Sequence, residues 1–142
     1  TPSSVTVLTC AAAGGSVASL LSNDNVFFSV SSTTTGNRTA GWYAAFASVP
    51  RTLTRLTVNY SGNNSRNCTQ SIAIWNWRTS VWVPLDSRTV GTTEIAIGGL
   101  VPSGALGDYV SGSAGVGEVR VRIQSQANQT FTSRGDVVTI VY

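Results

Sequence analysis

The sequence predicts an all-β chain that folds as an antiparallel β-sandwich with a jelly-roll-like topology. Ten short stretches alternate apolar and polar residues, as half-buried strands do. Clusters of Gly, Asn, Ser and Pro separate these stretches, and no segment carries the 3.6-residue apolar period of a helix. The 142 residues are enough for one hydrophobic core. We therefore expect a single module over residues 1–142, which would be part of a larger secreted protein.

The individual strands follow from this alternation. Val119, Val121 and Ile123 alternate with charged or polar residues, which predicts an apolar face inward and an arginine-bearing face outward. Residues 136–142 are apolar on both sides, which is typical of a central strand. At most one helical turn is expected over 16–21. The predicted strands span 4–8, 26–31, 41–49, 53–60, 70–77, 80–85, 93–97, 117–125, 129–133 and 136–142.

The composition excludes several kinds of chemistry. The chain has no His and no Met, and its nine basic residues are all Arg. Without His, catalysis by a Ser-His-Asp or Cys-His arrangement is excluded, and without Lys there is no Schiff base. The net charge of +3 is spread along the chain rather than clustered, so we expect no nucleic-acid partner. No apolar run approaches the ~20 residues of a membrane span, so no membrane partner is expected.

The N-terminus and the two cysteines bear on localisation. Residues 1–10 carry neither the charged region nor the apolar region of a signal peptide, so we expect one to have been removed or the chain to be a fragment. Cys10 and Cys68 are an even number of cysteines in a Ser/Thr-rich chain. Such a pair is typical of a disulfide in an oxidising, extracellular compartment, and two buried free thiols are the alternative.

Residues 72–83, IAIWNWRTSVWV, contain three of the four tryptophans and are the most informative stretch. If a two-residue turn at 79–80 joins two strands, Trp77 lies opposite Trp82 and Trp75 lies opposite Pro84. All four would then share one sheet face, with aliphatic residues on the other face. Pro84 further indicates a strand at the edge of its sheet, because proline has no N–H for a second ladder.

An aromatic face of this kind has two explanations, and the sequence leaves both open. Indoles can stack on the apolar faces of sugar rings, with Asn76 and Arg78 as polar neighbours. Alternatively, the indoles can be internal architecture, interleaved with Arg78, Arg120 or Arg122 or half-covered by the segment 98–116. Exposure of the rings would distinguish a binding surface from packing.

Two further aromatic residues stand out. Trp42 shares a strand face with Phe46 and is expected in the core. Tyr109 lies in or beside a loop, where it could contact a ligand or anchor the loop by packing.

The six carboxylates show no catalytic signature, although a hydrolase that uses two of them remains an alternative. Asp24, within the turn 22–25, and Asp136 could together hold a structural calcium ion. The competing explanation is an Asx-turn, in which Asp24 caps its own backbone. No other cofactor is expected.

Three blocks of the chain, residues 60–97, 107–125 and 135–142, resemble modules appended to secreted bacterial proteins, often extracellular hydrolases. The resemblance extends over about residues 15–142 and carries no fixed catalytic motif. It implies an extracellular β-sandwich accessory domain, similar in role to carbohydrate-binding modules.

Together these observations predict a non-catalytic, secreted module that binds a polysaccharide through Trp75, Trp77 and Trp82. It would tether a covalently linked catalytic domain to its substrate, and we expect it to be a monomer. A structural spacer or adhesion module without a ligand site is the first alternative, and a small carboxylate-based hydrolase is the second.

Overall fold

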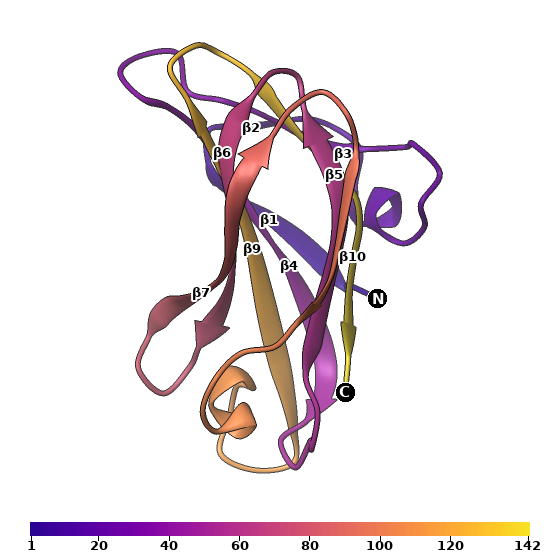
Figure 1. The fold of residues 1–142 in the computed structure, drawn as a ribbon. Helices are drawn as coiled ribbons and strands as arrows, with labels where there is room; N and C mark the ends of the chain where they lie inside the picture. Colours follow the sequence, from indigo (N-terminus) through magenta and orange to yellow (C-terminus); the bar gives the residue numbers. More distant parts are fainter.

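A computed structural model describes residues 1–142 as an antiparallel β-sandwich of jelly-roll-like organisation, which confirms the predicted fold class (Figure 1). Two five-stranded sheets pack face to face, and two single-turn 3-10 helices, η1 (Val17–Leu20) and η2 (Leu106–Tyr109), lie in the connections. Each of these helices is a single turn, so neither could span a lipid bilayer.

Sheet A carries the tryptophan hairpin and has the order β1-β4-β9-β6-β7. Its central strand β9 pairs with β4 on one side and with β6 on the other. Strand β7 is an edge strand, as Pro84 predicted. The strands of sheet A are β1 (Ser4–Thr9), β4 (Arg38–Pro50), β6 (Cys68–Asn76), β7 (Val81–Val90) and β9 (Val116–Ala127).

Sheet B has the order β2-β3-β10-β5-β8, so the last strand is central, as its two apolar sides predicted. The stretches 129–133 and 136–142 were expected to be separate strands, but they form the single strand β10, with a register shift between Gly135 and Val137. The strands of sheet B are β2 (Ala11–Gly14), β3 (Phe28–Ser31), β5 (Thr57–Asn64), β8 (Ile95–Leu100) and β10 (Thr132–Val141).

The core between the sheets consists of the apolar faces that alternation predicted. Val119, Val121 and Ile123 are fully buried from β9, and Trp42 is fully buried from β4. The Trp42 indole N–H donates to Ser133 Oγ in the opposite sheet at 3.3 Å. This packing leaves the opposite side of β6 and β9 on the outer face of sheet A, where the tryptophans of the hairpin lie.

Candidate functional site

The β6–β7 hairpin differs from the expected one in the length of its turn. Trp75 is the direct partner of Trp82, and the turn comprises the four residues 77–80 rather than two. The predicted pairing of Trp77 with Trp82, and of Trp75 with Pro84, is therefore wrong. The slip at this end of the hairpin is by two residues, however, and a two-residue slip keeps Trp75 and Trp82 on the sheet face predicted for them.

Asn76 fixes the conformation of this turn. Its side-chain Oδ1 accepts hydrogen bonds from the backbone N–H groups of Arg78 and Thr79, both at 3.0 Å. The backbone N–H of Ser80 also donates to the Asn76 carbonyl at 2.8 Å. The side-chain oxygen of Asn76 is thus engaged in the turn and positions Trp77 and Arg78.

The three indoles lie together, as the sequence predicted. The ring centroids of Trp75 and Trp82 are 5.1 Å apart, and those of Trp75 and Trp77 are 6.4 Å apart, both in edge-to-face geometry. Tyr43 of β4 extends the cluster, with its ring centroid 6.0 Å from that of Trp82. We call these four rings, with Arg120 and Arg122, the aromatic face. All four aromatic residues are half-buried.

Two arginines of β9 interleave with the rings. The guanidinium carbon of Arg120 lies 4.6 Å from the Trp77 centroid and 5.0 Å from the Tyr43 centroid. That of Arg122 lies 5.0 Å from the Trp82 centroid. Such cation–π contacts are worth ~0.5–1 kcal/mol at an exposed site. The interleaving of Arg120 and Arg122, one of the two explanations that the sequence left open, is therefore present, whereas Arg78 makes no such contact.

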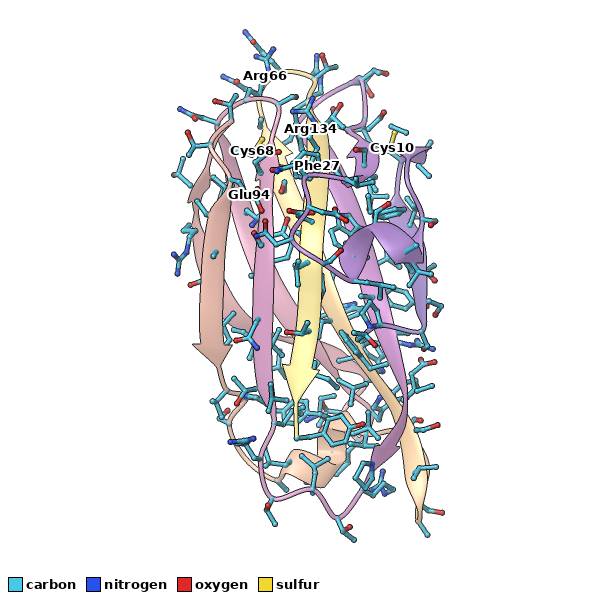
Figure 2. The ribbon with its side chains drawn as sticks, turned by 90° about the vertical axis from the view of Figure 1, so that its right-hand side faces the viewer. Cys10, Phe27, Arg66, Cys68, Glu94 and Arg134 are labelled. Carbon is cyan, nitrogen blue, oxygen red and sulfur yellow. The ribbon has the colours of Figure 1, made fainter.

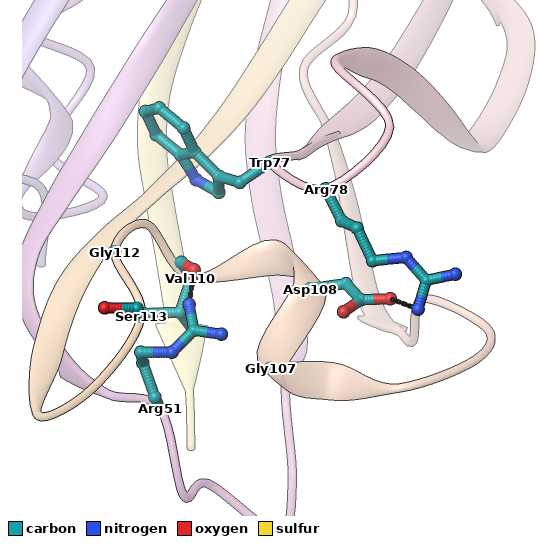
Figure 3. A pocket seen from close by; sticks show the side chains of 8 residues that line it. All are labelled: Arg51, Trp77, Arg78, Gly107, Asp108, Val110, Gly112 and Ser113. Atoms are coloured by element: carbon teal, nitrogen blue, oxygen red, sulfur yellow. Dashed lines mark hydrogen bonds and ion pairs between the residues drawn. The ribbon is translucent and has the colours of Figure 1, made fainter.

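The aromatic face continues into a pocket of about 440 Å³ at the end of the sandwich where η2 lies (Figure 3). Trp77 is one wall, and its backbone N–H donates to the Asp108 carbonyl at 2.8 Å. Arg78 forms an ion pair with Asp108 at 3.8 Å, and an Arg51 amino group donates to the Val110 carbonyl. The segment 98–116 therefore packs beside Trp77, as the second explanation anticipated.

Tyr109 packs against the interior, which is one of the two roles that the sequence left open. Only 3% of its surface is exposed, and its hydroxyl donates to the Ser103 carbonyl at 2.6 Å. It does not line the pocket beside η2, and its place among the ligand-binding residues stays a prediction.

Sequence reasoning missed Tyr43 and Arg51. Alternation puts Tyr43 on the face opposite to Trp42, but it does not reveal which strand lies beside β9. Arg51 follows β4 directly, and only the three-dimensional arrangement brings it near Trp77.

No pocket of the structure brings two carboxylates together. Asp86 and Glu118 form ion pairs with nearby arginines, and neither of the two pockets is lined by two carboxylates. Asp136 is fully buried, and Glu94 lies beside it. Burial is the largest cause that raises the pKa of Asp136, and the neighbouring Glu94 raises it further.

The Asx-turn expected at Asp24 is present, because its Oδ1 accepts from the Val26 N–H at 3.0 Å. Asp136 accepts from the backbone N–H groups of Asp24 and Asn25 at 3.4 and 3.3 Å. No group of three or more His, Cys, Asp or Glu side chains is arranged to hold a metal ion. A calcium ion on Asp24 and Asp136 stays a prediction.

The predicted disulfide is not formed, because the two cysteines lie apart across the width of the molecule (Figure 2). Cys10 is exposed where the chain passes from sheet A to sheet B, and its sulfur lies 3.1 Å from the Ser32 carbonyl. Cys68 is buried at the start of β6. Burial raises the pKa of the Cys68 thiol to about 11, although Arg66 acts in the opposite direction.

No protein-family model and no curated protein match the chain. Among solved structures, the chain is similar to a CBM4 module, with 9% identity, a TM-score of 0.43, and coverage of 80% of this chain and 93% of that one. It is also similar to TmCBM61 in complex with β-1,4-galactotriose, with 8% identity, a TM-score of 0.48, and coverage of 97% and 81%.

A third similar structure is the enzymatically active domain of tailspike protein 4 of bacteriophage CBA120. Its identity is 14% and its TM-score 0.47, and the match covers 97% of this chain but 19% of that one. At such scores the similarity carries no functional assignment, which has to come from the side chains themselves.

Proposed function

We propose that this chain is a non-catalytic polysaccharide-binding module and that the aromatic face of sheet A is its binding surface. The observation that carries the proposal is the gathering of Trp75, Trp77, Trp82 and Tyr43 on one outer sheet face, all half-buried rather than sealed in the core. A gathering of partly accessible rings on one face is typical of a binding surface.

The neighbouring side chains are suited to sugar hydroxyl groups. Gln124 follows Arg122 on the outer side of β9, with Ser71 and Gly41 as its partners on the flanking strands. A polysaccharide lying across sheet A would meet rings first and then amide and hydroxyl groups. Apolar contact combined with a few placed polar groups is the usual composition of a ligand site.

The wider setting forms part of the same proposal. The module would be secreted by a bacterium and joined covalently to a catalytic domain, and it would act as a monomer. By holding that domain at an insoluble substrate, it would raise the effective concentration of enzyme there.

A structural spacer is the second candidate, because Arg120 and Arg122 lie against the rings of Tyr43, Trp77 and Trp82. In a spacer these contacts would serve only to stabilise sheet A. Ala73 is consistent with such a layer, since it is on the outer side of β6 and yet only 2% exposed.

Affinity electrophoresis on a panel of polysaccharides, with pull-down on insoluble glucans and chitin, distinguishes the two candidates. For a binding module, we expect retention that Trp77→Ala abolishes while the cooperative urea transition is retained. Val81→Ala is the matched control, because Val81 begins β7 in the same hairpin and is 50% exposed. If no polysaccharide retains the wild-type chain, the binding proposal is wrong and the spacer is favoured.

A further inference from the structure

Arginines outnumber carboxylates around the aromatic face and its pocket. Four arginines lie there, Arg51, Arg78, Arg120 and Arg122, and only two of them have an acidic partner: Arg78 pairs with Asp108, and Arg120 pairs with Glu118. The Arg78–Asp108 pair is long, at 3.8 Å, and the Arg78 side chain is 75% exposed, so water weakens the attraction. Arg51 and Arg122 form no ion pair with the chain.

Arg122 lies in the middle of sheet A. Its strand neighbours are Tyr43 on β4 and Ala73 on β6, and its guanidinium group lies over the Trp82 ring. The residue is half-buried, and its Nε atom is buried without a hydrogen-bond partner. Burial also lowers the pKa of this guanidinium. A charge held out of water in this way is costly unless an anion pairs with it, and this chain supplies none.

The pocket beside η2 also combines an indole with an arginine that has no acidic partner. Trp77 belongs to both places, because one wall of the pocket is the same indole that Arg120 contacts. One Arg51 amino group donates to the Val110 carbonyl, and no carboxylate pairs with the remaining donors of this guanidinium (Figure 3). The Trp77 Nε1 atom is buried and likewise lacks a hydrogen-bond partner.

We propose that the ligand of the aromatic face is an acidic polysaccharide, whose carboxylate or sulfate groups bind at Arg122 and, in the pocket, at Arg51. This inference rests on the proposed function and names its substrate class. A guanidinium fork matches the planar oxygen pair of a carboxylate and also binds sulfate oxygens. Rings that flank the arginines would then contact the apolar side of the sugar.

Two pairs of polymers test this, because each pair keeps its type of backbone and changes its charge. Polygalacturonate is compared with its fully methyl-esterified form, and κ-carrageenan with its desulfated form. We expect the acidic member of at least one pair to retard the chain, with an apparent affinity about tenfold or more above that of its neutral partner. The pair that responds shows whether carboxylate or sulfate is the group bound. Raising NaCl from about 0.05 M to about 0.5 M should reduce retention.

Arg122→Gln should weaken retention by the acidic polymer about tenfold or more, and Arg51→Gln should weaken it by a smaller factor. Arg122→Lys keeps the charge without the fork and should lie in between. Arg55→Gln is the matched control, because Arg55 is exposed and forms no ion pair. Urea unfolding and near-UV circular dichroism of each variant separate loss of binding from loss of fold.

The outcomes separate this inference from the proposed function. If neutral polymers are retained as strongly as acidic ones, or if Arg122→Gln and Arg55→Gln weaken retention equally, the inference is overturned. The proposed function stands in those cases, provided that Trp77→Ala still abolishes retention. If no polymer of any kind is retained, both are wrong.

Discussion

Asp136 is a fully buried carboxylate that secures the segment before β3 through the backbone N–H groups of Asp24 and Asn25. Burial, the largest influence, raises its pKa from the ordinary value of 3.8, and the adjacent Glu94 adds to this effect. The two backbone donors act in the opposite direction, because they favour the charged form.

The raised pKa predicts how stability depends on pH. Between the ordinary and the raised pKa, the folded state binds more protons at Asp136 than the unfolded state does, so the free energy of unfolding falls as pH rises. Asp136→Asn cannot titrate and should flatten this part of the profile. Urea unfolding from about pH 4 to about pH 7 measures both slopes, and equal slopes would contradict the assignment.

At the residue scale, the sequence predicts most of the aromatic cluster but not its surroundings. Trp42 is in the core and the three hairpin indoles share a face, because alternation along a strand determines both. Tyr43 joins the cluster only because β4 lies beside β9, which is a long-range contact. Alternation also says nothing about Tyr109, whose environment depends on how its loop folds back.

At the element scale, the β6–β7 turn depends on one side chain. Asn76→Ala removes the acceptor for two backbone N–H groups and should lower the free energy of unfolding by ~1 kcal/mol. Asn76→Asp keeps an acceptor oxygen and should cost less. Thr79→Ala is the matched control, since its exposed side chain makes no hydrogen bond. Chemical denaturation measures all three, and an unchanged midpoint for Asn76→Ala would show that the turn does not need this contact.

Element types were predictable wherever alternation was strong, and boundaries were not. Strand β2 was missed because Ala11–Gly14 has no alternation and all of its residues are exposed, so it pairs with β3 without contributing to the core. The turn length was also missed, because the hydrogen bonds of Asn76 favour a longer turn than the two residues assumed.

At the scale of the whole molecule, the spacing of the two sheets depends on a glycine. A Cβ atom at Gly135 of sheet B would lie 2.7 Å from two ring carbons of Trp42 in sheet A.

The order of the strands, such as β9 between β4 and β6, could not be predicted from local sequence patterns. Strand order depends on contacts between residues that are far apart in the sequence.

Gly135→Ala should therefore lower the free energy of unfolding by ~1–3 kcal/mol, because the core ring has to move. Gly14→Ala is the matched control, since a Cβ at Gly14 meets nothing within 4 Å. Urea unfolding followed by tryptophan fluorescence measures both. A Gly135→Ala variant as stable as wild type would show that Trp42 repacks without cost.

The position of Pro84 on edge strand β7 has a consequence for crowded conditions. Proline has no N–H to offer a neighbouring polypeptide, and the Asp86–Arg88 pair puts charges two and four residues further along the same strand. These features therefore disfavour the addition of a strand from a second molecule to the edge of sheet A at β7. At high local protein concentration, we therefore expect edge strand β7 to resist the strand addition that leads to fibrils.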